Sequence, residues 1–123
     1  MNLWRSERGA AAVEFALVLP LLLLIVLGTI EFGRAYNAQI SLTHAARESA
    51  RTMAITSNWV EAVSTGRSAA PSLNSTAMTF TPSSTTCTAN STVNVTVTYP
   101  LQTVTGIADN MTLTGKAAMR CGG

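Results

Sequence analysis

The amino-acid sequence predicts an α+β protein with a long N-terminal transmembrane helix, a short second helix and a small C-terminal antiparallel sheet. Three observations support this fold class. Nearly all long aliphatic residues lie in the first third of the chain, apolar residues at helical spacing follow, and beyond Pro71 apolar and polar residues alternate. Charged residues make up only 11% of the chain, far below the proportion of about a quarter that is usual in proteins. This composition does not indicate an ordinary soluble surface.

Residues 10–30 form the apolar segment, and Glu14 is its only charged residue. A helix of about 20 apolar residues is long enough to cross the hydrocarbon core of a bilayer. Arg5 and Arg8 precede the segment, and basic residues in this position stay in the cytoplasm. We therefore predict that the chain after residue 31 is exported.

A cleavable secretory signal is an alternative interpretation of this segment. The apolar region of such a signal normally has about 7–15 residues and ends at a small-x-small cleavage site. Residues 10–30 are longer than that, and residues 28–34 offer no convincing site. The sequence therefore favours a segment that stays in the protein.

Two residues inside the segment need a physical reason. Pro20 lacks an N–H and clashes with the carbonyl of Ala16, which predicts a kink or local melting of the helix. A carboxylate at the depth of Glu14 costs on the order of 3 kcal/mol. Either Glu14 lies shallow and reaches the lipid headgroups, or it finds a cationic partner inside an assembly.

The helix is predicted to continue outside the membrane over residues 31–54, so that residues 10–54 span roughly 65–70 Å at about 1.5 Å per residue. One face of this exported part carries small and apolar residues, and charged residues such as Arg47 lie opposite. The residues of the apolar face are Ala38, Leu42, Ala45, Ala46, Ser49 and Met53. We expect this face to receive the exported head, residues 55–123.

The head is predicted to contain one helix and three strands. The helix begins at Trp59 after an N-cap in the Ser57-Asn58 region and ends between Gly66 and Ala70. The alternating segments then predict a small antiparallel sheet packed on the outer half of the long helix. The clearest strand ends at Pro100 and carries on one face Val93, Val95, Val97 and Tyr99. Its partner strand opens at Asp109-Asn110 and carries on one face Met111, Leu113, Gly115, Ala117 and Met119. A shorter third strand is predicted around Met78 and Phe80.

Cys87 and Cys121 are the only cysteines, and both lie in the part of the chain that we expect to be exported. An oxidising compartment favours a disulfide between them. Closing a loop of about 35 residues stabilises a domain by about 3–4 kcal/mol in the chain-entropy model. Two free buried thiols are the alternative.

The sequence argues against several functional classes. The net charge is only +2, and Arg and Lys form no run or stripe of the kind that binds nucleic acid. His44 and Glu48 lie one helical turn apart, but without a third ligand a solvated helix face is the simpler interpretation than a metal site. The Ser and Thr hydroxyls lack a nearby base that could activate them. We therefore expect no enzyme activity and no cofactor.

Residues 8–15, RGAAAVEF, resemble the processing site of type IV-like prepilins. In those proteins a prepilin peptidase cuts after a Gly and leaves a Glu at the fifth position of the mature chain, followed by a hydrophobic residue. The resemblance implies that residues 1–9 are a leader, that cleavage follows Gly9 and that Ala10 becomes the N-terminus. Glu14 and Phe15 then occupy the fifth position and the one after it.

The longer stretch of residues 9–34, GAAAVEFALVLPLLLLIVLGTIEFGR, together with residues 45–51, resembles the TadE-like pseudopilins of tight-adherence (Flp) pilus systems. The resemblance covers about residues 8–54 and implies a pilin-like fold. It implies a minor pilin-like subunit, since major Flp pilins are usually much shorter. In such an assembly the Glu14 carboxylate would pair with the α-ammonium of a neighbouring subunit, and breaking one partner of a buried pair costs about 3–5 kcal/mol.

The resemblance also implies a location and partners. The protein is expected in the bacterial inner membrane as a single-pass protein, with a cytoplasmic N-terminus and a periplasmic head, and from there in an extracellular pilus. The expected partners are other pilin or pseudopilin subunits, a prepilin peptidase, the inner-membrane assembly platform and the lipid bilayer. The alternative is an unprocessed single-pass scaffold of a secretion or assembly machine in the cell envelope.

Overall fold

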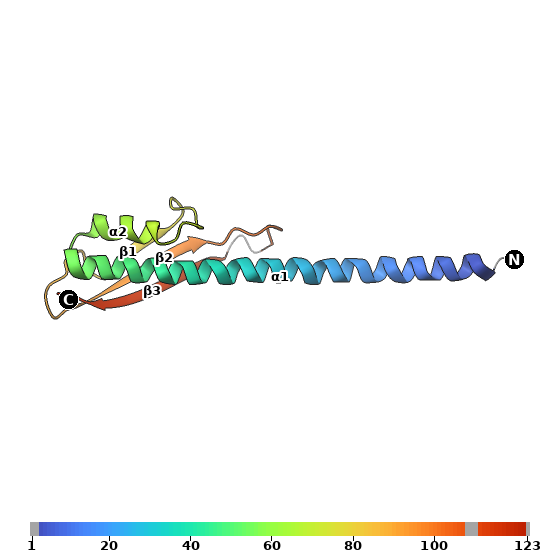
Figure 1. The fold of residues 1–123 in the computed structure, drawn as a ribbon, viewed down its shortest axis with the longest axis horizontal. Helices are drawn as coiled ribbons and strands as arrows, with labels where there is room; N and C mark the ends of the chain where they lie inside the picture. The colour runs from blue at the N-terminus through green and yellow to red at the C-terminus, as the bar shows by residue number, and fades with distance from the viewer. Residues whose placement is uncertain (1–2, 108–110, 123) are drawn as a thin grey trace. The chain divides into compact units, whose positions relative to one another are not determined.

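The computed structural model describes residues 3–107 and 111–122, with side chains from residue 7 onward. Its elements follow the order α1 (Leu3–Thr56), α2 (Trp59–Ser68), β1 (Thr79–Pro82), β2 (Thr92–Pro100) and β3 (Thr112–Arg120) (Figure 1). This order confirms the predicted α+β fold. The chain divides into two compact units, Met1–Gly33 and Arg34–Gly123, which we call the N-terminal unit and the head.

The N-terminal unit is helical from Leu3 onward, so α1 begins earlier than Ala10, where the sequence analysis placed its start. Residues 3–8 include Leu, Arg and Glu, which are good helix formers, and Gly9 costs only about 1 kcal/mol relative to Ala. Helix formation therefore has no reason to stop at the expected cleavage position. α1 also stays helical through Pro20, so the helix does not melt there, and a bend at this residue stays a prediction.

In the head, α1 buries the small and apolar face that the sequence predicts. Leu42 and Met53 are fully buried, as are the three alanines between them. Ser49 is fully buried too, and its hydroxyl has no hydrogen-bond partner among the described residues. Arg47 and Arg51 are exposed. Because the buried side chains are mostly small, the rest of the head can approach the α1 backbone closely.

A tight corner joins α1 to α2. Ser57 adopts a positive φ of 53°, and its amide donates a hydrogen bond to the Met53 carbonyl oxygen at 2.9 Å, which ends α1. Asn58 is the N-cap of α2, because its side-chain oxygen accepts a hydrogen bond from the Glu61 amide at 3.2 Å. The start of α2 at Trp59 and its N-cap agree with the prediction.

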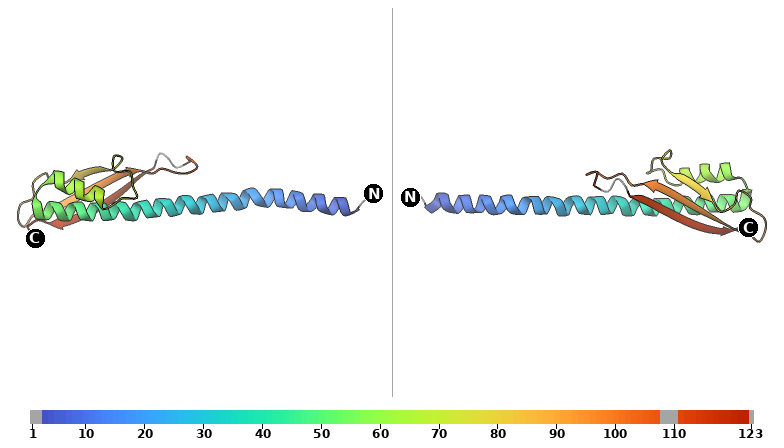
Figure 2. Two further views of the ribbon diagram at one scale, coloured as in Figure 1. Left: turned by 45° about the horizontal axis from the view of Figure 1, so that its top comes forward. Right: turned by 180° about the vertical axis from the view of Figure 1, so that it is seen from behind.

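β1, β2 and β3 form one antiparallel sheet with β2 in the centre. Figure 2 shows this sheet beside the C-terminal part of α1. The short strand predicted around Phe80 is β1, and Pro100 is the last residue of β2. Asp109 and Asn110, which were predicted to open β3, lie outside the described residues. The inward residues of β2 are buried as predicted, and these are Val93, Val95, Val97 and Tyr99.

β3 lies directly against the backbone of α1 at Gly115. A Cβ atom on this glycine would stand 2.7 Å from the carbonyl carbon and oxygen of Leu42 and 2.9 Å from the nitrogen of Thr43. Beside this contact, the Gln39 side-chain amide donates a hydrogen bond to the Thr114 carbonyl oxygen at 2.8 Å. Only glycine leaves room for so close an approach of strand and helix.

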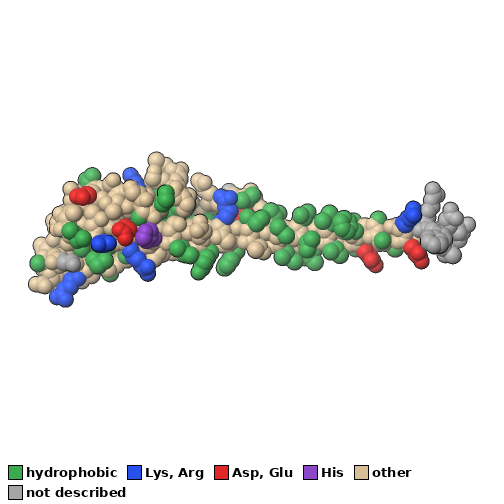
Figure 3. All heavy atoms as spheres, viewed as in Figure 1, with side chains coloured by type: hydrophobic (Ala, Val, Ile, Leu, Met, Phe, Trp, Pro, Cys, Tyr) green, Lys and Arg blue, Asp and Glu red, His purple; other side chains and the backbone are tan. Residues whose placement is uncertain are grey.

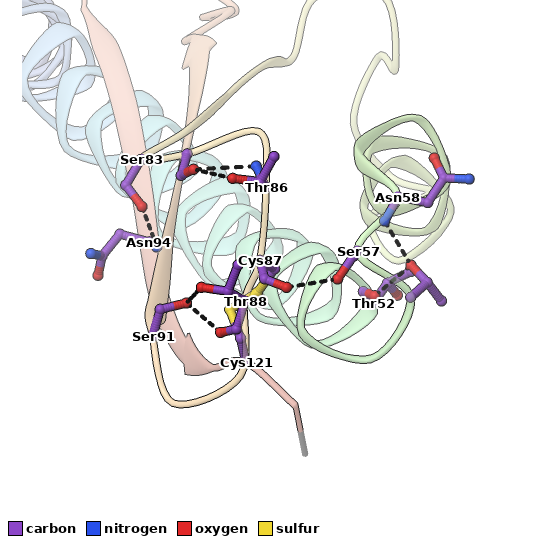
Figure 4. Close-up of a disulfide and its surroundings, with 12 residues drawn as sticks. Thr52, Ser57, Asn58, Ser83, Thr86, Cys87, Thr88, Ser91, Asn94 and Cys121 are labelled. Atoms are coloured by element: carbon purple, nitrogen blue, oxygen red, sulfur yellow. Dashed lines mark hydrogen bonds between the residues drawn. A yellow bond between two sulfur atoms is a disulfide. The ribbon is translucent and has the colours of Figure 1, made fainter.

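The predicted disulfide between Cys87 and Cys121 is present (Figure 4). The Ser57 hydroxyl donates a hydrogen bond to the Cys87 carbonyl oxygen at 2.9 Å. On the other side, the Cys121 amide donates to the Ser91 carbonyl oxygen at 2.8 Å, and the Gly122 amide donates to that of Ala54 at 3.1 Å. The disulfide joins the end of β3 to the loop before β2, and the hydrogen bonds of Ser57 and Gly122 hold both segments at the corner between α1 and α2.

Replacing Gly115 by Ala is expected to destabilise the head by about 1–3 kcal/mol, because the added methyl group overpacks the contact with α1. The measurement is denaturant unfolding of the full chain in detergent micelles. Gly33→Ala is the matched control, since nothing lies within 4 Å of a Cβ atom at Gly33. Equal stability of the two variants would contradict the close contact.

The disulfide closes a loop with a sequence separation of 34 residues. Loss of the bond in the double variant Cys87→Ser, Cys121→Ser is expected to lower the free energy of unfolding by about 3–4 kcal/mol in the chain-entropy model. Unfolding curves with and without a reducing agent provide the measurement. A reducing agent should destabilise the native chain and leave the double variant unchanged, and an unresponsive native chain would rule out a stabilising role.

Candidate membrane and assembly interface

The N-terminal unit presents an exposed apolar helix surface in its described part. Over the most apolar stretch of α1, none of the residues is buried. The exposed fractions of Leu17 and Leu24, two turns apart, are 72% and 69%. Figure 3 shows hydrophobic side chains along the visible side of this segment. Soluble monomers rarely expose a continuous apolar surface of this extent.

The length and composition of this surface suit a membrane span. By length and composition the helix is apolar enough to cross a bilayer. The core helix of a soluble domain would be mostly buried, and this segment is not. The Thr29 hydroxyl donates a hydrogen bond to the Ile25 carbonyl oxygen at 2.8 Å, so this polar side chain is satisfied within the helix. The segment fits a membrane-anchored protein.

Glu14 lies on this surface and its side chain is exposed, as is that of its neighbour Phe15. Within the part of the chain whose side chains are described, Glu14 has no hydrogen bond and no ion-pair partner. A carboxylate that is buried in lipid or in a helix bundle needs such a partner.

The two residues of the predicted processing site lie inside α1. Gly9 and Ala10 are both exposed, and nothing lies within 4 Å of a Cβ atom at Gly9. The predicted cleavage position is therefore helical in the uncut chain. Gly9 is the residue of this region with the weakest helix propensity. Pro20 lies further along the same exposed surface, and the site residues share no pocket.

The head carries features that the sequence analysis did not single out. Val104 and Ile107, in the connection between β2 and β3, are exposed, and so is Met111 after it. A signal was available, since Asp109 is the only charged residue between Arg67 and Lys116. A connecting loop that contains several large apolar residues and one charged residue is unusual at a water-exposed surface.

The polar surface of the head offers no gathered metal ligands in its described part. His44 is exposed and Glu48 is half-buried on the outer side of α1. Among the described residues, no group of three or more His, Cys, Asp and Glu side chains could hold a metal ion. The guanidinium of Arg67 lies 5.9 Å from the centre of the Phe80 ring, a cation–π contact that fixes α2 over β1.

Residues 9–51 match the family model of TadE-like proteins. Over these residues the chain is TadE-like. The TadE-like match contains Gly9, Ala10, Glu14, Phe15 and Pro20, together with most of the helix face that the sheet covers. No curated protein and no solved structure shows significant similarity to the chain.

TadE-like proteins are structural components of tight-adherence (Tad) pilus systems. The match therefore indicates a protein associated with these pili. The match likewise indicates association with other pilus components. The exposed apolar helix fits a membrane-anchored component of such a system.

Proposed function

We propose that the protein is a minor pseudopilin that assembles with other pilin-like subunits of a Tad pilus after a prepilin peptidase removes residues 1–9. The observation that carries the proposal is Glu14. It is a single carboxylate on an exposed apolar helix, without a partner among the described side chains, at the fifth position after the Gly9–Ala10 bond. A simple membrane anchor has no need of it.

Cleavage after Gly9 has two physical consequences. It removes Arg5, Glu7 and Arg8, whose charges would be costly in an apolar helix bundle. It also creates an α-ammonium group on Ala10. This positive charge can pair with the Glu14 carboxylate of a neighbouring subunit, which sets the axial position of one helix against the next.

The topology follows the distribution of charge and the disulfide. Arg5 and Arg8 before the apolar segment favour a cytoplasmic N-terminus. The disulfide between Cys87 and Cys121 suits an oxidising compartment, which supports a periplasmic head. The processed protein would meet the assembly platform in the inner membrane and leave it with the growing pilus. After the peptidase has cut the chain, assembly itself is noncovalent, and the protein catalyses no step of it.

An unprocessed single-pass scaffold is the second candidate. The observation that favours it is the start of α1 at Leu3, because residue 9 is then no boundary in the secondary structure. In this case the protein would keep its first nine residues and would remain in the membrane. Glu14 would then lie near the headgroups instead of in a helix bundle.

The N-terminus of the protein recovered from envelope and sheared-surface fractions distinguishes the two candidates. Intact-mass and peptide mass spectrometry are expected to find a chain that begins at Ala10. Replacement of Gly9 by Leu should block the cut, and Gly28→Leu is a matched control on the same helix with equally open surroundings. A native chain that begins at Met1 in every fraction would refute processing.

Replacing Glu14 by Ala is expected to abolish entry into the pilus while the membrane-bound amount stays the same. Loss of one partner of a buried pair costs about 3–5 kcal/mol, and about 3 kcal/mol corresponds to a roughly 100-fold lower equilibrium constant. Quantitative immunoblots of sheared-surface and membrane fractions measure both amounts.

Glu61→Ala is the control for that experiment, because Glu61 is an exposed carboxylate on α2 in the head. It should enter the surface fraction as the native chain does. Normal amounts of the Glu14 variant in the surface fraction would show that ammonium pairing does not drive assembly.

A further inference from the structure

β3 is an edge strand, and the edge that faces away from β2 is open. The order of the sheet is β1-β2-β3, and in the described part of the chain no strand pairs with the outer edge of β3. Figure 2 shows β3 at the margin of the sheet. An open edge presents a row of backbone N–H and C=O groups with which a strand of another chain can pair.

The hydrogen bonds at the two ends of β3 show which of its backbone groups face outward. The Cys121 amide donates to the Ser91 carbonyl oxygen at 2.8 Å, and the Met111 carbonyl oxygen accepts from the Leu101 amide at 2.9 Å. Residues 111 and 121 therefore both face β2. Because backbone groups alternate in direction along a strand, the odd-numbered residues of β3 face β2 and the even-numbered residues face the open edge.

The open edge is free over the C-terminal half of β3. At Thr114 the carbonyl oxygen already accepts a hydrogen bond from the Gln39 side chain of α1. The next outward residues are Lys116, Ala118 and Arg120, and all three are exposed. Among the described residues, their backbone N–H and C=O groups have no hydrogen-bond partner. These groups are available to a further strand.

The opposite edge of the sheet is poorly suited to strand pairing. β1 has only 4 residues, Thr79–Pro82. The Ser83 amide donates a hydrogen bond to the Asn94 carbonyl oxygen at 2.8 Å, so by the same alternation Pro82 faces outward. Proline has no N–H to donate. The longer edge with more donors is the one at β3.

Two cations on the open edge select the strand that can pair there. Lys116 and Arg120 have no ion-pair partner among the described residues, and Arg120 reaches only the Asn90 side-chain oxygen at 3.5 Å. Charged residues on an edge strand keep out strands of like charge. No described strand of the chain contains Asp or Glu. Antiparallel pairing of two β3 strands about Ala118 would place Lys116 opposite Arg120, so a second copy is disfavoured.

We propose that the open edge receives an extended acidic segment of a different protein, which pairs with β3 as an added strand. In antiparallel pairing, acidic side chains opposite Arg120 and Lys116 point to the same face of the sheet as these cations. The residue midway between them lies opposite Ala118. A shallow hollow of about 400 Å³ beside Ala118, lined also by Asn94 and Thr96, leaves room there for a large side chain. The expected pattern is acidic–x–large–x–acidic.

This inference goes beyond the proposed function, because it rests on the head alone. It depends neither on cleavage after Gly9 nor on the pairing of Glu14. The partner contact that it assigns is made by backbone groups and cations of β3. Failure of either proposal would therefore leave the other standing.

The test measures binding of a fluorescently labelled peptide, TEVYVET, to the full chain in detergent micelles by fluorescence anisotropy. In the expected register its acidic residues lie opposite Arg120 and Lys116, and its tyrosine lies opposite Ala118. The charge-reversed peptide TKVYVKT is the matched control and should bind about tenfold more weakly or less. The double variant Lys116→Glu, Arg120→Glu should reverse this preference. Equal binding of both peptides to the native chain would overturn the proposal.

N-methylation of the peptide distinguishes strand pairing from simple charge attraction. A methyl group on the tyrosine amide removes an N–H that faces β3, whereas one on the preceding valine amide removes an N–H that faces away. The first should abolish binding and the second should not, and equal effects would overturn strand pairing. Ala118→Pro should also abolish binding, since the Ala118 N–H makes no bond within the sheet. Unchanged formation of the disulfide checks the fold of this variant.

A second copy of the chain is the competing occupant of the open edge. Light scattering without peptide compares the native chain with the Ala118→Pro variant over a range of concentrations. Equal masses of the two are expected, because the cations of β3 oppose self-pairing. A dimer of the native chain that the Ala118→Pro change removes would assign the edge to a contact between copies and overturn the proposal.

Discussion

The contact between β3 and the backbone of α1 is the constraint on which the rest of the head depends. Gly115 brings the strand within van der Waals distance of Leu42 and Thr43. This approach places β2, the neighbour of β3, over the small side chains of α1 and buries its inward residues. α2 closes over the sheet in the same way, since a Cβ atom at Gly66 would stand 2.5 Å from the Phe80 ring. Small residues thus determine how closely the elements pack.

Much of this arrangement could be predicted from the sequence because each element has a clear period. The Val residues of β2 alternate with polar residues, and Asn58 stands before the first turn of α2. The close approach at Gly115 could not be predicted, because glycine in a strand is also compatible with a bulge or a bend. α1 begins at Leu3, before Ala10, because residues 3–9 have enough helix propensity to extend the helix beyond the apolar segment. The loop with Ile107 was missed since it has no period.

The candidate site is of a different kind, because its assignment rests on the sequence pattern. An interface between the helices of two subunits involves a second molecule, so a single chain shows the surface and not the contacts. For Glu14 the structure shows one thing, namely that no described side chain forms a hydrogen bond or an ion pair with it. The TadE-like match includes Glu14 and the apolar residues around it. A carboxylate in such apolar surroundings is stabilised by a cationic partner.

Under the proposed function, the unfavourable position of Glu14 becomes part of the assembly mechanism. A carboxylate in a lipid-exposed helix costs on the order of 3 kcal/mol, and this cost is carried by the free subunit and relieved by pairing in the pilus. The free subunit is therefore destabilised in the membrane relative to the assembled one. Without a cut after Gly9 the α-ammonium partner does not exist, and the unprocessed subunit gains nothing from joining the bundle. Proteolysis then controls assembly through a single charge, while the head, which packs on its own stretch of α1, keeps the same fold before and after the cut.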